Sequence, residues 1–125
     1  PAIGAFIAYK SVHIRSKRRT PLGKAILQLL VPATATRYQA FADPYNSKLR
    51  VSEVTVLRIV RHKDLKRGCT GFNSSKHKLT SSHDHTYTYQ VGATHKPANG
   101  FNTDTVQCAG GLHCFLQEGD AYDYM

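Results

Sequence analysis

Residues 49–60 read Leu-Arg-Val-Ser-Glu-Val-Thr-Val-Leu-Arg-Ile-Val, and this stretch decides the fold more than any other. Aliphatic and β-branched side chains recur at alternate positions through it, which is the period of a β-strand. The polar pair Ser52-Glu53 interrupts the pattern and indicates either a bulge or the junction between two strands. The sequence therefore predicts one long strand, or two strands in succession, at the centre of the chain.

Four further segments predict strands on either side of this one. The apolar run at residues 25–31 ends at Pro32 and is typical of a buried strand. Residues 86–91 alternate strictly as Thr-Tyr-Thr-Tyr-Gln-Val, so both tyrosines should share one face of a strand. Shorter strands are expected at residues 5–10 and 112–116.

The rest of the pattern predicts the fold class. Residues 117–124 begin with acidic side chains, which favour the start of a helix. Basic stretches that contain glycine or proline, at residues 13–21 and 61–82, predict surface loops. We therefore expect a single compact α+β domain over residues 1–125, with about five or six strands and a C-terminal helix.

Charge is distributed unevenly along the chain. The sequence has 17 basic and 8 acidic residues. Residues 1–78 hold 16 basic and three acidic residues, a net charge of +13, whereas residues 79–125 hold one basic and five acidic residues, a net charge of −4. This asymmetry predicts an oriented electrostatic surface, whose counterpart is nucleic acid, an acidic protein or the acidic end of another copy.

Cysteine content and hydropathy indicate where the protein acts. The three cysteines, Cys69, Cys108 and Cys114, form an odd and sparse set, which argues against a secreted disulfide framework. An intracellular reducing compartment is expected instead. No apolar run approaches the roughly 20 residues that a membrane span requires, so no membrane partner is expected.

Two groups of cysteine and histidine residues are candidates for metal binding. Cys108 and Cys114 are separated by five residues, which is wider than the usual pair of zinc ligands. His83 and His85 would point to the same side of a strand, which makes them the better candidates. A turn shaped by glycines 110–111 and a solvated loop explain both groups without a metal, so we expect no metal site and no cofactor.

A Cys–His catalytic pair is the next alternative. His113 and Cys114 are neighbours on a predicted strand and point to opposite faces, so neither can act directly on the other. Cys108 and His113, on either side of the glycine turn, remain an alternative pair. The sequence contains no complete catalytic set, and we expect no catalytic residues.

Six short segments follow one another in the order of a known domain family. They are residues 8–12 (Ala-Tyr-Lys-Ser-Val), 25–33 (Ala-Ile-Leu-Gln-Leu-Leu-Val-Pro-Ala), 47–57 (Ser-Lys-Leu-Arg-Val-Ser-Glu-Val-Thr-Val-Leu), 89–92 (Tyr-Gln-Val-Gly), 108–115 (Cys-Ala-Gly-Gly-Leu-His-Cys-Phe) and 121–124 (Ala-Tyr-Asp-Tyr). Together they resemble a domain of unknown function that recurs in proteins of large DNA viruses and some microbes, often beside pentapeptide-type repeats. The chain departs from that family at Leu49, where the family often has Cys, at Cys114, where it has Phe, and in the basic stretch 61–82. Because the family has no assigned activity, the resemblance implies a fold and a virus-like origin.

A second resemblance gives the alternative function. Residues 111–115 followed by Ala121-x-x-Tyr124 are similar to a segment of ADP-ribosyltransferases, in which the tyrosine stacks on nicotinamide. The resemblance would give that role to Tyr124 and would place Lys10 where those enzymes need His or Arg. The later acidic residue that most of them use has no match here. The alternative is therefore an ADP-ribosyltransferase-like enzyme or a degenerate relative of that fold.

The two basic stretches supply the candidate binding residues. We expect a non-enzymatic virus- or phage-encoded structural or interaction protein, whose basic face binds nucleic acid or an acidic protein partner. Other copies of the chain or virion proteins are further candidate partners, and the virion is a second candidate location. The candidate residues are Arg15, Lys17, Arg18, Arg19, Lys63, Lys66, Arg67, Lys76 and Lys78.

Overall fold

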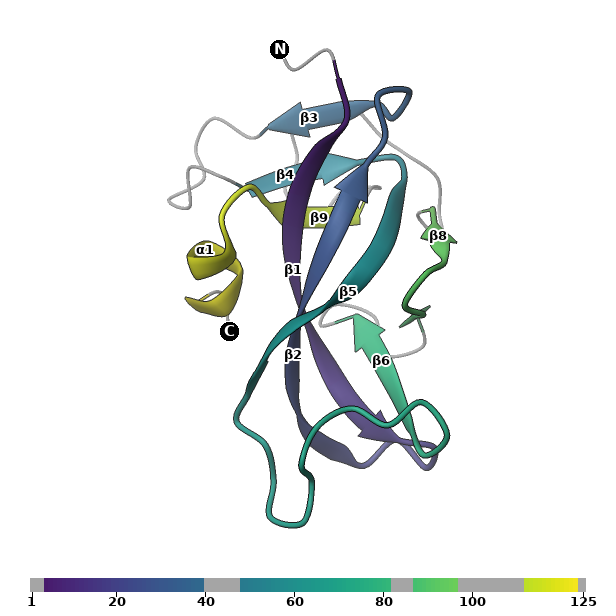
Figure 1. Cartoon of the computed structure of the whole chain (residues 1–125), viewed down its shortest axis with the longest axis vertical. Helices are drawn as coiled ribbons and strands as arrows, with labels where there is room; N and C mark the ends of the chain where they lie inside the picture. Colours follow the sequence, from purple (N-terminus) through teal and green to yellow (C-terminus); the bar gives the residue numbers. More distant parts are fainter. Residues whose placement is uncertain (1–3, 40–47, 82–86, 97–111, 124–125) are drawn as a thin grey trace.

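The computed structural model describes residues 4–39, 48–81, 87–96 and 112–123 of the chain. These residues form nine strands and one short helix (Figure 1). The elements are β1 (Phe6–Ser16), β2 (Pro21–Val31), β3 (Arg37–Gln39), β4 (Lys48–Val51), β5 (Val54–Lys63), β6 (His77–Ser81), β7 (Thr88–Tyr89), β8 (Thr94–His95), β9 (Leu112–Phe115) and α1 (Glu118–Asp123).

A long antiparallel hairpin of β1 and β2 is the central element of the sheet. Its register runs from Phe6 opposite Val31 to Arg15 opposite Pro21. The surface loop expected at residues 13–21 is therefore wrong, because all but the turn belongs to the two strands. Ile14 explains the difference: it is fully buried, and its pairing with both β2 and β6 holds the basic stretch in an extended conformation.

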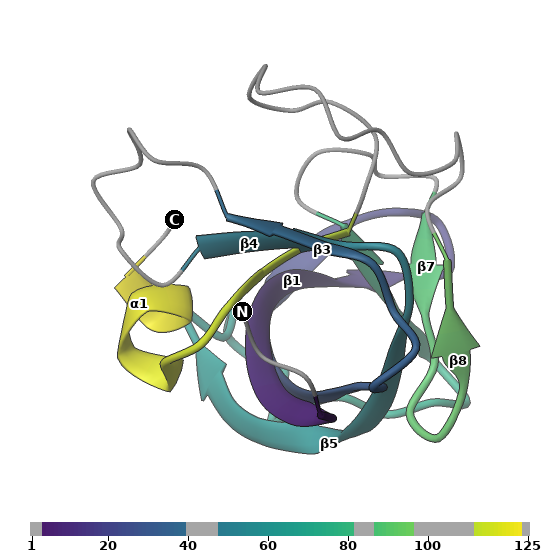
Figure 2. The same ribbon diagram turned by 90° about the horizontal axis from the view of Figure 1, so that it is seen from above.

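All pairings in the described sheet are antiparallel, and the sheet curls into a half-barrel (Figure 2). The order is β3-β4-β9-β1-β2-β5-β8, and β6 pairs with the second half of β1 and carries β7. Two register shifts in the β2–β5 ladder, at the steps Ile26/Leu27 and Gln28/Leu29, increase the local twist and help the sheet to curl.

The segment 87–96 bridges the two edges of the half-barrel. On one side β7 pairs with β6, and the amide of Ser81 donates to the carbonyl of Tyr87 at 3.0 Å. On the other side β8 pairs with β5, and the amide of Gly92 donates to the carbonyl of Val56 at 2.7 Å. One short piece of chain therefore joins strands that are not neighbours in the rest of the sheet.

The Ser52-Glu53 interruption is the junction between two strands. Before it, β4 pairs with β3 and β9; after it, β5 pairs with β2 and β8. Of the two alternatives that the sequence left open, the structure therefore contains two strands rather than one bulged strand.

The hydrophobic core has an inner and an outer part. The inner cluster fills the curl of the sheet with fully buried side chains such as Val12, Leu27 and Val56. In the outer cluster, Ala121 of α1 packs with Ile26 and Phe115. Figure 2 shows that α1 lies outside the curl of the sheet. The described part of the chain contains no helix with the length and hydropathy of a membrane span.

The expected α+β class with five or six strands is wrong. The described residues are mostly β, and their helix has only six residues. The strands that the sequence did not predict are short: β3 has three residues, β6 has five and β8 has two. Such strands form because neighbouring strands supply hydrogen-bond partners. Their own residues therefore show little of the alternating pattern from which a strand can be predicted.

Candidate functional site

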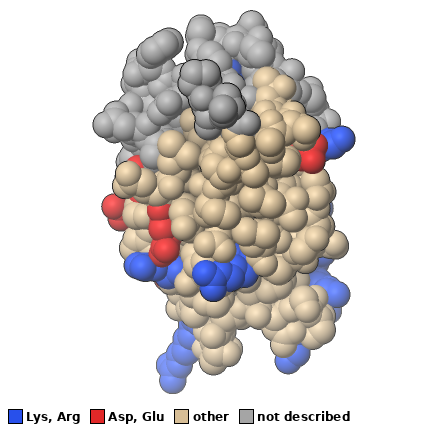
Figure 3. Space-filling view, turned by 45° about the horizontal axis from the view of Figure 1, so that its top comes forward, with Lys and Arg blue, Asp and Glu red and all other residues tan. Residues whose placement is uncertain are grey.

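Most of the predicted basic residues gather at one end of the half-barrel. Pairing between β1 and β6 sets Arg15 opposite Lys78, which brings the start of β6 beside the β1–β2 turn. We call this the basic end; it is the lower end of the ribbon in Figure 1, and Figure 3 shows Lys and Arg side chains at the lower end of the surface. Its exposed cations are Lys17, Arg18, Arg19, Lys66, Arg67, Lys76 and Lys78.

The loop that follows β5 is attached to the hairpin, which explains why its cations join those of the turn. The amide of Lys66 donates to the carbonyl of Leu22 at 2.8 Å. At Gly23 (φ 153°), a Cβ atom would lie 2.8 Å from the Leu65 side chain, so glycine permits this close approach. Lys24 also contacts the Asp64 carboxylate at 3.4 Å.

Two of the predicted residues have structural contacts instead of projecting freely. Nη1 of Arg15 donates to the carbonyl of Arg19 at 3.1 Å and so supports the turn. Lys63 points away from the basic end toward α1, where its Nζ donates to the carbonyl of Tyr122 and lies 4.3 Å from the centre of that ring. Lys63 therefore belongs to the helix contact.

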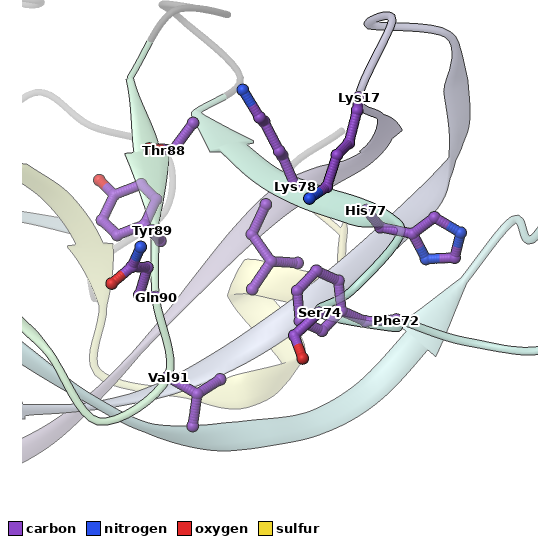
Figure 4. Close-up of a pocket in the computed structure, with 10 residues that line it drawn as sticks. Lys17, Phe72, Ser74, His77, Lys78, Thr88, Tyr89, Gln90 and Val91 are labelled. Carbon is purple, nitrogen blue, oxygen red and sulfur yellow. The ribbon is translucent and has the colours of Figure 1, made fainter.

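A cleft of about 590 Å³ lies beside the basic end, between β7 and the loop that leads into β6 (Figure 4). Core residues Leu79 and Tyr89 contribute to its lining, together with Phe72 and Val91. Its remaining lining residues are polar or basic: Lys17, Ser74, His77, Lys78, Thr88 and Gln90.

Two histidines fix the loop wall of the cleft. Nε2 of His62 accepts a hydrogen bond from the amide of Phe72 at 3.3 Å. Nδ1 of His77 accepts one from the amide of Asn73 at 3.0 Å. The Asn73 side chain in turn accepts from both the amide and the hydroxyl of Ser75. This wall is therefore a hydrogen-bonded turn that presents Phe72 in a defined position.

The opposite wall is held by a cluster of aromatic rings. The Tyr89 ring lies 5.1 Å from that of Tyr87 and 4.9 Å from that of His95, measured between centroids. Nε2 of His95 accepts from the amide of Gln90 at 3.0 Å, and the Tyr87 hydroxyl donates to the carbonyl of Lys96. The two tyrosines do pack on one side, as their spacing predicted, although β7 spans only two residues.

The electrostatics of the cleft favour an anion. Lys17 and Lys78 line it, and none of its described lining residues is a carboxylate. Burial raises the pKa of Tyr89 far above its usual value, with the neighbouring Tyr87 and Cys114 adding to the rise, so this phenol stays neutral. The cleft therefore combines positive charge, aromatic surface and neutral polar groups.

A lysine and a cysteine meet inside the half-barrel. Nζ of Lys10 donates to the carbonyl of His113 at 2.8 Å and lies 5.9 Å from the Tyr89 ring centroid. Burial raises the pKa of Cys114 to about 12, against the opposing effect of Lys10. The thiol is therefore protonated near neutral pH, which makes it a poor nucleophile.

The residues considered for metal binding or catalysis form no such site among the described residues. His113 and Cys114 occupy successive positions in β9, opposite Arg50 and Leu49, so they face opposite sides of the sheet. Among the described residues, no group of three His, Cys, Asp or Glu side chains is arranged to hold a metal ion. The candidates His83, His85, Cys108 and Tyr124 lie outside the described residues.

The sequence interpretation missed the aromatic and polar lining of the cleft. Phe72 is the sole aromatic residue in the basic stretch 61–82, and that isolation was an available signal. Gln90 and Val91 were noted only as part of an expected strand and of a family motif, and neither pattern placed them beside the basic residues; the bridge between β5 and β6 brings them to the cleft.

Comparison with known proteins identifies the family. The chain belongs to a family of unknown function, DUF5758, which matches residues 1–121. Membership of a domain family of unknown function, which the motifs predicted, is thus confirmed. No curated protein and no solved structure matches the chain.

Proposed function

We propose that this chain is a non-enzymatic binding module whose basic end binds nucleic acid. One observation carries the proposal: cations from the β1–β2 turn, the loop after β5 and the start of β6 converge on one end of the half-barrel. All seven cations of the basic end are exposed. Their convergence depends on the β1–β6 pairing and on the contact between Lys66 and Leu22.

Phosphate backbones provide the matching charge. Each phosphate that a lysine or arginine neutralises releases a condensed counterion, which makes binding favourable and strongly dependent on salt. Several exposed cations at one end of a rigid sheet suit a repeating polyanion, because neighbouring side chains can contact successive phosphates. Glu118 of α1 does not oppose this, since its carboxylate is paired with Arg61 at 2.8 Å.

Nucleic acid is favoured over an acidic protein because of the cleft. An aromatic side chain and neutral hydrogen-bonding groups lie directly beside the cations, and these suit bases as well as phosphates. The buried, protonated thiol of Cys114 supports a binding role over a catalytic one.

Origin and location are also part of the proposal. The motif resemblance supports a gene of viral or phage origin, with other copies or virion proteins as further partners. Cys69 and Cys114 are free thiols, which suits a reducing intracellular compartment or the virion.

Salt-dependent DNA binding tests the basic end. Fluorescence anisotropy of a labelled DNA duplex would be measured from low to physiological salt for the wild type and for Lys17→Ser/Arg18→Ser. The matched control, Arg58→Ser/Lys96→Ser, removes the same charge elsewhere. We expect the salt slope to fall by roughly 1–2 in the first variant, given about 0.9 per phosphate contact, and to change little in the control. Equal losses in both variants, or no binding by the wild type, would overturn the proposal.

A further inference from the structure

We infer that the cleft beside the basic end holds one unpaired nucleotide, so that the protein prefers single-stranded to duplex nucleic acid. The inference rests on the proposed function and specifies its substrate class. It arises from the position of the cleft, which shares Lys17 and Lys78 with the basic end. A strand bound to those cations would therefore pass the mouth of the cleft.

The size and apolar lining of the cleft suit a base. Its volume of about 590 Å³ lies within the range of small-ligand sites, roughly 300–1,000 Å³. Phe72 is only partly buried, so part of its ring is available to a ligand. Val91 is 48% exposed, and the core residue Leu79 also contributes to the lining. A planar ring can thus be held between apolar surfaces, and every base offers such a ring.

The polar groups of the cleft are arranged by type. In Figure 4, Lys17 and Lys78 extend from neighbouring elements at one side of the cleft, while Gln90 lies across from Ser74. Ammonium groups suit the phosphate, and an amide or a hydroxyl can donate to or accept from the edge of a base. Lining of this kind fits the two parts of a nucleotide better than it fits an apolar peptide.

The walls of the cleft are already ordered. Histidine nitrogens accept hydrogen bonds from the backbone amides of Phe72 and Asn73 on one side of the cleft, and from that of Gln90 on the other. Ordering these groups in advance lowers the entropic cost of binding. A paired base cannot enter, because its edge and both of its faces are already occupied in the duplex. The cleft therefore contributes only to the binding of single strands.

A direct comparison of strands tests the inference. Binding of a 15-nucleotide oligothymidine and of a 15-base-pair duplex would be measured at one salt concentration. We expect the wild type to bind the single strand about ten-fold more tightly, since stacking of one base on an aromatic ring is a moderate effect. Phe72→Leu should remove most of that preference and leave duplex binding unchanged.

A second variant guards against misfolding. Ser74→Leu changes an exposed residue and partly fills the cleft, so it should also reduce the preference without disturbing the core. Leu57→Ala, which alters an exposed apolar residue outside the cleft lining, is the matched control. Equal affinity of the wild type for both probes, or a preference that survives in Ser74→Leu, would overturn the inference while the proposed function stands. If the wild type binds neither the single strand nor the duplex, both the inference and the proposed function are overturned.

Discussion

The basic end and the region where α1 packs on β9 use the same residue types in opposite ways. At the helix, Arg61 and Lys63 lie 5.1 and 4.3 Å from the Tyr122 ring centre, and Arg61 also pairs with Glu118. At the basic end, Lys17 and Lys78 are exposed and have no carboxylate partner among the described residues. The helix region therefore uses its cations for stability, whereas the basic end leaves them available to a ligand.

The largest effect should come from the packed region. Phe115 is 3% exposed and packs under α1 with Ile26 and Ala121. Phe115→Ala should lower the free energy of unfolding by about 3–5 kcal/mol through lost contacts and a cavity. Urea titration monitored by circular dichroism measures this loss in the free energy of unfolding. DNA affinity per folded molecule should not change; loss of binding without loss of stability would reverse the roles of the two regions.

Alkaline pH should weaken the inner core of the half-barrel through Cys114. Its pKa rises from 9.0 to about 12 on burial, so the native state keeps a proton that the unfolded state releases. Stability from this thiol is complete below pH 9 and should fall by roughly 1.4 kcal/mol per pH unit between those values. Cys114→Ala should show a correspondingly shallower decline in urea titrations across this range. If native Cys114 reacts with iodoacetamide at pH 8 as fast as Cys69 does, the thiol is not buried as described.

Two sets of cations from the same basic stretch should behave differently. Lys66→Ser/Arg67→Ser changes exposed residues of the basic end and should weaken DNA binding about ten-fold at low salt, with stability within about 0.5 kcal/mol of wild type. Lys63→Met should leave DNA affinity unchanged and cost about 1 kcal/mol, because its Nζ contacts Tyr122. Fluorescence anisotropy measures the DNA affinity of each variant, and thermal melts on the same samples measure its stability. Equal effects on binding would remove the distinction between the two regions.

The smallest effect should come from the exposed ion pair at the helix. The side chains of Arg61 and Glu118 are 54% and 32% exposed, so solvent screens their attraction. Arg61→Ala should lower stability by about 0.3–1 kcal/mol, including its contact with Tyr122, and the loss should shrink in high salt. A loss that is independent of salt would indicate that packing on Tyr122, and not charge, is the main contribution.

Local sequence patterns predicted part of the fold correctly. The apolar run 25–31 lies in β2, and the break at Ser52-Glu53 separates β4 from β5. The C-terminal helix forms at Glu118–Asp123, within the expected range. These predictions succeeded because the sequence pattern and the structural feature lie in the same few residues. The patterns are an apolar run, a polar interruption and acidic side chains in a first helical turn.

The candidate site was predicted only in part, for the same physical reason. Charge is visible in the sequence, so the cations of the basic end were identified. The role of Lys63 was not, because it depends on a contact with Tyr122, which lies 59 positions further along the chain. The cleft was missed as well, since its two walls come from residues 72–78 and 88–91 and are brought together by the pairing of β6 with β7, which the sequence pattern did not predict.

The sequence by itself determined that this chain is basic in its first part, contains apolar strands and carries its cations in two stretches. Tertiary structure alone decided that the strands curl into a half-barrel, that the segment 87–96 bridges its edges, and that the two basic stretches meet beside a cleft. The physical reason lies in the range of the interactions. Composition and alternation are properties of neighbouring residues, whereas register and curl depend on hydrogen bonds and burial between residues far apart in the chain.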